Sequence, residues 1–332
     1  MNQGMFRFKI FLIFLFSYFL IFLFSLSSAW ATTIFSPLLE IEAEPGEEQR
    51  GIVKIFNETE ADLLLVSSIE PFKAGDEDGQ PLYLAPEQKY AYLNWFKLDL
   101  DSLVLKSHQV VIIPFTVTVP KDATPGGYYA VIFWQDVPPQ AEKDKVSVSG
   151  KVGTLIFLKV KGELIEKGEV LEFKTNPEKK YFWQLPVIFS TRFSNVGNIH
   201  LKPSGQIELT NSFGRKVILE INPSQRNVLP QSIRRFEVAW GKSEGGNFLV
   251  SFWPKLKEEI SGLAFGQYTA TLNLDYGSSN QQATSQSLSF WLIPIRSIIA
   301  LLSLIIILIA LVKFNSKIQK LKRQAKSPNV KR

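Results

Sequence analysis

Hydrophobic and polar residues alternate with a period of two over much of the chain between residues 32 and 290. Residues 113–119 read IPFTVTV, and residues 268–276 read YTATLNLDY. A period of two is typical of β-strands that bury one face. Because Pro114 cannot donate a backbone hydrogen bond, we expect its part of the strand to lie at a sheet edge or a bulge.

Ten further segments are rich in β-branched and aromatic residues, and no long amphipathic helix stands out between them. These predicted strands are Leu38–Ala43, Gly51–Phe56, Leu63–Ile69, Tyr128–Trp134, Gly153–Val160, Val187–Phe193, Gln206–Leu209, Val217–Ile221, Phe236–Trp240 and Leu288–Ile293. Short strands separated by Pro, Gly and Asn turns indicate an all-β protein.

We expect two immunoglobulin-like β-sandwich domains, at residues 32–164 and 165–290. The boundary is predicted near Lys161–Lys167, where KGELIEKG interrupts the apolar pattern. Gly127–Tyr129 and Gly266–Tyr268 both read G-x-Y at the start of a late strand. A tyrosine there can bond back across an immunoglobulin-like sandwich as a tyrosine corner, so the shared tripeptide is a faint sign that the second half repeats the first.

A long apolar run lies near the end of the chain. The 22 residues from Trp291 to Val312 contain Arg296 as their one charge. About 20 apolar residues are needed to cross a hydrocarbon core of about 30 Å. We therefore predict a transmembrane helix at residues 291–314, with the Arg296 guanidinium extended toward headgroups and Trp291 in the aromatic belt.

The two flanks of this run predict the topology. Eight basic residues and no acidic residue follow Val312, so the tail at 315–332 is expected in the cytoplasm. Residues 1–31 contain Arg7 and Lys9, an apolar stretch and the small-residue site Ala29–Ala31, as in a signal peptide. Cleavage after Ala31 is expected, the alternative being an uncleaved second span; either version leaves the middle of the chain outside the cell membrane.

The net charge of the middle region differs in sign from that of the whole chain, because many basic residues lie in the two ends. The whole chain has 37 basic and 31 acidic residues, a net charge of +6. Eleven of the basic residues lie in the two ends, which leaves 26 against all 31 acidic residues, or −5, for the middle. We therefore do not expect nucleic-acid binding. The chain has no cysteine, which excludes disulfides and thiolate chemistry.

No residue pattern predicts an enzyme, a metal site or a cofactor. The two histidines, His108 and His200, follow polar turns without a base–nucleophile spacing. Gly75–Gly79 resembles part of a calcium loop, but prolines disturb its continuation and a solvated hairpin tip is favoured. Asn57–Thr59 fits a glycosylation sequon and is interpreted as a turn.

Aromatic residues supply the only ligand-binding candidates. Tyr90, Tyr92 and Trp95 follow a polar stretch and could stack on sugar rings, although a core-capping role is favoured for Trp95. The remaining tryptophans of the middle region are assigned to cores or to the domain junction: Trp134, Trp183, Trp240 and Trp253.

Three segments carry a resemblance to a known family. Val119–Trp134 (VPKDATPGGYYAVIFW) and Ser36–Leu65 resemble the N-terminal, peptidoglycan-binding domain of WxL-interacting proteins of Gram-positive bacteria. Asn195–Gly205 resembles the N-x-G-N-x-H-x-x-P-x-G signature of the domain that follows it in that family. The resemblance implies two sandwiches outside one membrane, the first contacting cell wall and the second a partner protein or host matrix.

The expected function is that of a non-catalytic, membrane-anchored surface protein that binds cell-wall polymer, peptidoglycan first, or other surface proteins. The alternative is an envelope assembly scaffold or chaperone-like protein that pairs an exposed sheet edge with a partner strand. A membrane-tethered hydrolase is the least favoured hypothesis.

Overall fold

The computed structural model describes residues 14–16, 32–84, 90–137, 150–241, 248–262, 265–283 and 285–325. Apart from residues 14–16, the predicted signal peptide lies outside these residues, as does the tail beyond Ala325. The chain forms two compact units. The first consists of Met1–Phe72, Leu84–Thr124 and Tyr128–Val160, and the second of Lys73–Tyr83, Pro125–Gly127 and Lys161–Arg332.

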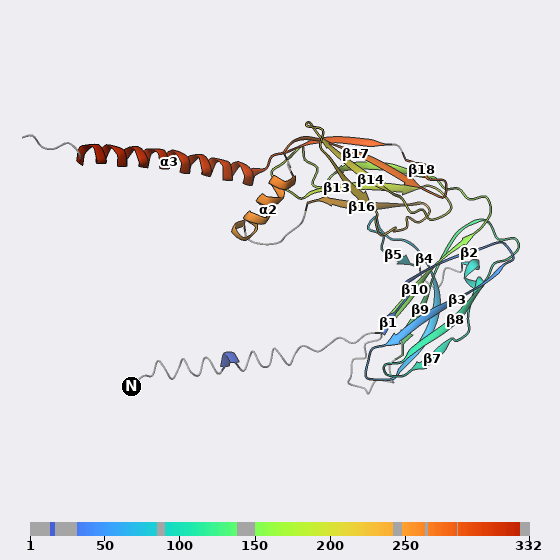
Figure 1. Ribbon diagram of the computed structural model, residues 1–332. Helices are drawn as coiled ribbons and strands as arrows, with labels where there is room; N and C mark the ends of the chain where they lie inside the picture. Colours follow the sequence, from blue (N-terminus) through green and yellow to red (C-terminus); the bar gives the residue numbers. More distant parts are fainter. Residues whose placement is uncertain are drawn as a thin grey trace, which may run out of the picture. The chain divides into compact units, whose positions relative to one another are not determined.

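The first unit is a sandwich of two sheets (Figure 1). The four-stranded sheet has the order β1 (Thr32–Ile34), β3 (Glu48–Asn57), β8 (Val110–Thr118) and β6 (Phe96–Leu98). The six-stranded sheet has the order β2 (Leu38–Ala43), β10 (Lys151–Val160), β9 (Gly126–Asp136), β4 (Leu63–Ala74) and β5 (Pro81–Tyr83), with β7 (Ser102–Leu105) paired to β4. Of these strands, β5 and the last two residues of β4 group with the second unit. A short 3-10 helix, η1 (Ala91–Trp95), precedes β6.

The core of the first unit follows from the period of two. On β3 and β8, Val53, Ile55, Ile113 and Phe115 point between the sheets and are fully buried. Alternate residues of the same strands point outward. Burial of such side chains is the main stabilising term for a chain without disulfides.

The second unit repeats the same arrangement. Its three-stranded sheet has the order β11 (Gly168–Thr175), β13 (Val187–Asn195) and β16 (Ser232–Trp240). Its six-stranded sheet has the order β12 (Tyr181–Phe182), β19 (Gln286–Leu292), β17 (Gly266–Tyr276), β14 (Ser204–Asn211) and β15 (Lys216–Ile221), with β18 (Gln281–Gln282) paired to β17. Aromatic packing dominates the core, with the Tyr268 and Phe290 rings 5.7 Å apart.

Both units divide their first strand between the two sheets. In the first unit β1 pairs antiparallel with β3, and β2 then pairs parallel with β10. In the second, β11 pairs antiparallel with β13, and β12 pairs parallel with β19. This shared topology confirms the predicted pair of immunoglobulin-like β-sandwiches.

One helix of the second unit was not predicted. Helix α2 (Phe248–Gly262) lies beside the start of α3 (Ile295–Ala325) and contains Pro254. A proline inside a segment usually argues against a helix, so the sequence did not indicate this one. Trp134 and Trp240 lie in cores, which is one of the two positions predicted for them, whereas Trp183 and Trp253 are 57% and 73% exposed and do not lie in a core.

The apolar run near the end forms one helix that is long and apolar enough to cross a membrane, from Ile295 to Lys320. The predicted start at Trp291 was wrong, because Trp291 and Leu292 are strand residues paired with Gln267 and Gly266. The helix begins only after Pro294. Its apolar part, Ile295–Val312, is about 27 Å long at about 1.5 Å per residue.

Arg296 does not extend outward as predicted. Its side chain is 4% exposed, and its guanidinium lies 3.7 Å from the Glu259 carboxylate. The partner comes from α2, the helix that was not predicted, and for this reason the sequence could not indicate it.

A tyrosine of the first G-x-Y segment bonds back to the chain upstream of it, as in a tyrosine corner. The Tyr128 hydroxyl donates to the carbonyl oxygen of Thr124, four residues upstream, at 2.8 Å. Tyr129, the tyrosine of G-x-Y, lies outside the inter-sheet core, whereas Tyr268 lies within the core of the second unit. The two tripeptides are therefore out of register by one residue.

Pro114 takes the position expected of it. It lies opposite Ile52 of β3, and β6 ends at the pair Leu98–Phe115 just before it. The missing N–H therefore faces a side of β8 that no strand among the described residues covers.

Candidate binding surfaces

The structure brings the three predicted ligand-binding residues together on the first unit. The Tyr90 and Tyr92 rings lie 5.8 Å apart, and those of Tyr92 and Trp95 lie 6.2 Å apart. The prediction did not include Tyr128, whose ring centroid lies 4.6 Å from that of Trp95 and 5.3 Å from that of Tyr92. It arrives from a distant strand, so spacing in the sequence could not have indicated it.

The side chains of this aromatic cluster are half-buried, and several of them pack against the core. Tyr92, Trp95 and Tyr128 pack against the inter-sheet core. The Tyr92 hydroxyl donates to the Tyr129 carbonyl oxygen at 2.9 Å. Burial, and secondarily the proximity of Tyr90, raises the pKa of Tyr92 to about 12. The alternative that Trp95 caps the core therefore matches its packing, and whether the cluster also binds a ligand stays a prediction.

An exposed apolar surface lies on the outer face of the four-stranded sheet. Ile52 of β3 and Ile112 of β8 are 56% and 55% exposed, although they lie at the outward positions, where polar residues are usual. They are joined by further apolar residues from the same strands and the segment after β1. We name this set the outer patch: Phe35, Ile52, Phe56, Val110, Ile112 and Pro114.

The members of the outer patch are neighbours in the sheet. Ile52 lies opposite Pro114, and Phe56 lies opposite Val110. The Phe35 ring lies 6.5 Å from that of Phe56. Lys54 lies among them, opposite Ile112, with its ammonium nitrogen 5.0 Å from the centroid of the Phe35 ring. Exposed apolar side chains gathered on one face of a soluble protein commonly mark interaction sites.

An unpaired strand edge borders the outer patch. β3 has 10 residues, but β1 pairs only with Ile55–Asn57, and a last bond joins the Phe35 amide to the Lys54 carbonyl oxygen at 3.2 Å. No strand among the described residues pairs with Glu48–Val53 on that side. In an antiparallel ladder, hydrogen-bonding residues alternate, so the backbone groups of Arg50 and Ile52 point into this vacant position.

The segment that resembled a calcium loop forms the tip of the β4–β5 hairpin. The Asp76 carboxylate accepts the backbone amides of Asp78 and Gln80, each at 3.0 Å. The tip, like Arg192 and Arg235, belongs to the second unit. Its two other carboxylates are bound to these arginines, Glu77 by Arg192 of β13 and Asp78 by Arg235 of β16 at 2.6 Å.

The tip is therefore a docked hairpin, and the prediction of a solvated tip was wrong. Its contacts are electrostatic and also include the backbone. The Arg235 amide donates to the Glu77 carbonyl oxygen at 2.6 Å. The hydrogen bond from Arg192 lowers the pKa of Glu77 below its ordinary value. Two carboxylates neutralised by guanidinium groups are poor candidates for calcium ligands.

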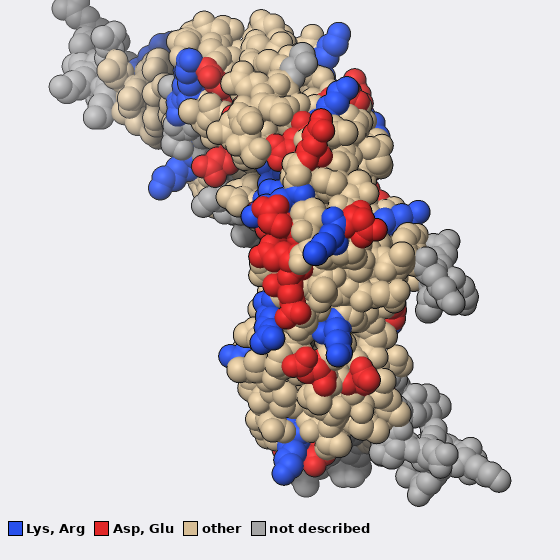
Figure 2. Space-filling model, turned by 90° about the vertical axis from the view of Figure 1, so that its right-hand side faces the viewer, with Lys and Arg blue, Asp and Glu red and all other residues tan. Residues whose placement is uncertain are grey.

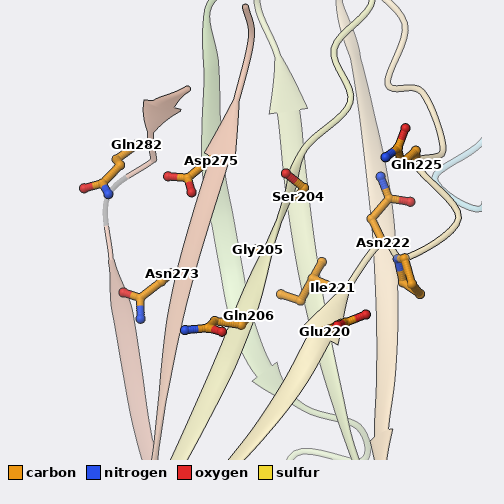
Figure 3. Close-up of a pocket in the computed structure, with 11 residues that line it drawn as sticks. Ser204, Gly205, Gln206, Glu220, Ile221, Asn222, Gln225, Asn273, Asp275 and Gln282 are labelled. Atoms are coloured by element: carbon orange, nitrogen blue, oxygen red, sulfur yellow. The ribbon is translucent and has the colours of Figure 1, made fainter. Parts of the chain in front are cut away.

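A shallow polar hollow lies on the outer face of the six-stranded sheet of the second unit (Figure 3). It has a volume of about 580 Å³. Gln206 lies opposite Asn273 and Glu220 on the neighbouring strands, and Asp275 lies opposite Gln282. The side chains at its floor are thus planar amides and carboxylates, which can form paired hydrogen bonds to neighbouring hydroxyl groups.

The signature that resembled the second family domain serves the fold. The Asn195 side chain donates to the carbonyl oxygens of Ile199 and Val228, both at 2.8 Å, and accepts the Gly197 amide at 2.9 Å. Asn195 is fully buried. Its bonds fix the turn after β13, so the first residue of this motif serves the fold.

Among the described residues, no three His, Asp or Glu side chains come together as a metal site. His108 lies in a positive-φ turn, with its imidazole 3.2 Å from the Glu60 carboxylate. Figure 2 shows basic and acidic side chains interspersed over the viewed face, with uncharged areas between them. This face has no extended basic area of the kind that nucleic-acid binding requires.

The sequence matches no family model and no curated protein. The fold is similar to solved structures of fimbrial chaperones. The class 5 fimbriae chaperone CfaA is 12% identical, over 80% of this chain and 100% of that chain, with a TM-score of 0.37. The Escherichia coli chaperone DraB is 10% identical, over 78% and 98%, with a TM-score of 0.34.

The Pseudomonas aeruginosa CupB2 chaperone is likewise 10% identical, over 77% of this chain and 98% of that chain, with a TM-score of 0.34. At these identities and scores the likeness supports no conclusion about function. A functional assignment therefore depends on the surfaces described above.

Proposed function

We propose that this chain is a non-catalytic, membrane-anchored protein with both sandwiches outside the membrane, and that it binds an extended segment of another polypeptide along β3. The observation that carries the proposal is the vacant strand position beside Glu48–Val53, next to the outer patch. This is the chaperone-like or scaffold role, in which a sheet edge pairs with a partner strand.

The geometry of β3 supports a peptide partner over other ligands. A strand placed in line with β1 would receive the backbone hydrogen bonds of Arg50 and Ile52. Every second side chain of that strand would lie on the outer face, beside Ile52 and Phe35. Backbone pairing supplies affinity, and the outer patch selects apolar residues at alternate positions.

The membrane anchor in the proposal is supported by α3 and the sequence that follows it. The apolar part of α3 is followed by Lys313, Lys317 and Lys320 without an acidic residue. By the positive-inside rule this end faces the cytoplasm, which leaves the sandwiches on the opposite side.

Site-specific photo-crosslinking in intact cells tests the proposal. A photo-reactive amino acid is placed at Ile52 of the full chain, and at Ile165 in a control, because the two side chains are equally exposed at 56%. We expect a discrete adduct with another protein from position 52 and none from position 165. Equal yields at the two positions, or an adduct only with a second copy of this chain, would contradict the proposal.

A second candidate function is recognition of a hydroxyl-rich polymer by the second unit. The specific observation is the polar hollow, in which Gln206, Asn273 and Asp275 lie together. This candidate retains the predicted role at the cell wall but assigns it to the other sandwich. The test measures how much of the full chain is retained on protein-free cell walls. Retention that falls at least several-fold in the double variant Gln206→Ala, Asn273→Ala would support this candidate. Equal retention of the variant and the unchanged chain would exclude the hollow as the binding site.

A further inference from the structure

The exposed aromatic residues of the second sandwich gather at one end. Between residues 161 and 294, every aromatic side chain that is exposed in the described structure lies at the end from which α3 departs. They are Tyr181, Trp183, Phe213, Trp253, Phe265 and Trp291. We name this set, together with Ile260, the aromatic collar.

Strand pairing and ring contacts hold the collar together. Tyr181 lies opposite Trp291 on paired strands. The Trp183 carbonyl oxygen accepts the amide of Ile295, the first residue of α3, at 3.3 Å. On the neighbouring turn, the rings of Phe213 and Phe265 stack with their centroids 6.4 Å apart.

Helix α2 contributes the most exposed member. Trp253, Lys257 and Ile260 lie at positions i, i+4 and i+7, which share one face of a helix. All three are exposed, whereas Leu256 on the adjacent face is 6% exposed and packs inward. Among the α2 side chains that the structure describes, this exposed face thus carries two apolar groups and one ammonium group.

A buried carboxylate fixes α2 to the start of α3. The Glu259 carboxylate accepts both the amide and the hydroxyl of Ser297, at 2.9 Å each. Arg296 lies beside it, and both charged side chains are nearly fully buried. A carboxylate at a helix N-terminus is favourable for the helix dipole, so this contact stabilises the position of α2 next to α3.

We infer that the aromatic collar rests in the interfacial layer of the bilayer around the entry point of α3, with α2 lying on the membrane surface. The inference rests on the proposed membrane anchoring. The occupant is lipid, because the collar is continuous with the apolar helix α3, which begins three residues after β19 ends. Tryptophan and tyrosine favour the headgroup level, and Lys257 is placed to contact lipid phosphate.

Fluorescence quenching by spin-labelled lipids tests this position. The chain has no cysteine, so single cysteines can be labelled without further changes. The full chain is reconstituted in liposomes with a probe at Ile260→Cys. Ile218→Cys on β15 is the matched control, because Ile260 and Ile218 are 59% and 58% exposed. A third probe at Ile306→Cys reports on α3 itself.

We expect headgroup-labelled lipid to quench the probe at position 260 several-fold more than the probe at 218, and chain-labelled lipid to quench the probe at 306. Equal, weak quenching at positions 260 and 218 with strong quenching at 306 would show that the collar does not contact the bilayer, while α3 still spans it. Weak quenching at all three positions would overturn both.

Discussion

Asn57 and Asn195 occupy the same place in the two sandwiches, each as the last residue of a central strand and each fully buried. Asn57 accepts the Thr59 amide at 2.9 Å and donates to the Ala61 carbonyl oxygen at 2.8 Å. Asn195 bonds to the residues at the same offsets, two and four positions further on. The two units therefore share this asparagine hydrogen-bonding pattern as well as a topology.

Replacing either asparagine with alanine should destabilise its unit by about 1–3 kcal/mol, because buried carbonyl groups lose their hydrogen-bond donor. For Asn57 these include the carbonyl oxygen of Leu105, at 3.1 Å from the amide nitrogen. Thermal unfolding of the full chain in detergent measures the effect, and the exposed Asn94→Ala is the control. Unfolding temperatures that match the control would show that the bonds contribute little. The burial of Asn57 also means that this sequon cannot accept a glycan in the folded protein.

Gly197→Ala should be strongly destabilising. A Cβ at Gly197 would collide with the carbonyl oxygen of Ile165, a backbone atom that cannot move aside without displacing its own segment. Gly150→Ala is the matched control, since a Cβ there meets nothing within 4 Å. Thermal melts should show a lower unfolding temperature for the Gly197 variant alone, and equal melts for the two variants would refute the packing argument.

Docking of the β4–β5 hairpin should weaken in acid. The hydrogen bond from Arg192 holds the pKa of Glu77 below its ordinary value of 4.5, so folding favours the ionised carboxylate. The stabilisation is therefore present above about pH 4.5 and is lost as the pH falls through the lower folded-state pKa. Glu77→Gln should lower the unfolding temperature at pH 7 and flatten its decline below pH 4.5.

Glu178→Gln is the control for that measurement, because Glu178 is a far more exposed carboxylate, 3.8 Å from Lys174. Its unfolding temperature should follow that of the unchanged chain at every pH. If the Glu77 variant also followed the unchanged chain, the hairpin contact would have no measurable part in stability.

Features that depend on residues close together in the sequence could be predicted from it. The alternation in residues 113–119 and 268–276 indicated which side chains point inward, and β8 and β17 have that orientation. The apolar run before the basic tail indicated α3. Tyr90, Tyr92 and Trp95 could be grouped because they are neighbours in the sequence.

Features that depend on distant contacts could not be predicted. Tyr128 joins the aromatic cluster because β9 returns beside η1, and residues 73–83 group with the second unit because Arg192 and Arg235 bind the hairpin tip. The vacant edge of β3 depends on β1 stopping after three residues, a length that the sequence TTI does not reveal. The exposure of Trp183 and Trp253 could not be predicted, because the residue type alone does not show whether a tryptophan side chain is buried or exposed.

The most direct test of partner-strand pairing combines a crosslinking probe with a block of the strand edge. The photo-reactive residue is placed at Ile112, on the outer patch, in full chains with and without Ile52→Pro. Proline removes the N–H of residue 52, which faces the vacant position and bonds no described strand. We predict a protein adduct from the unblocked chain and its loss in the proline variant, with the unfolding temperature of the variant within a few degrees of the parent. An adduct of undiminished yield in the folded proline variant would contradict pairing along β3.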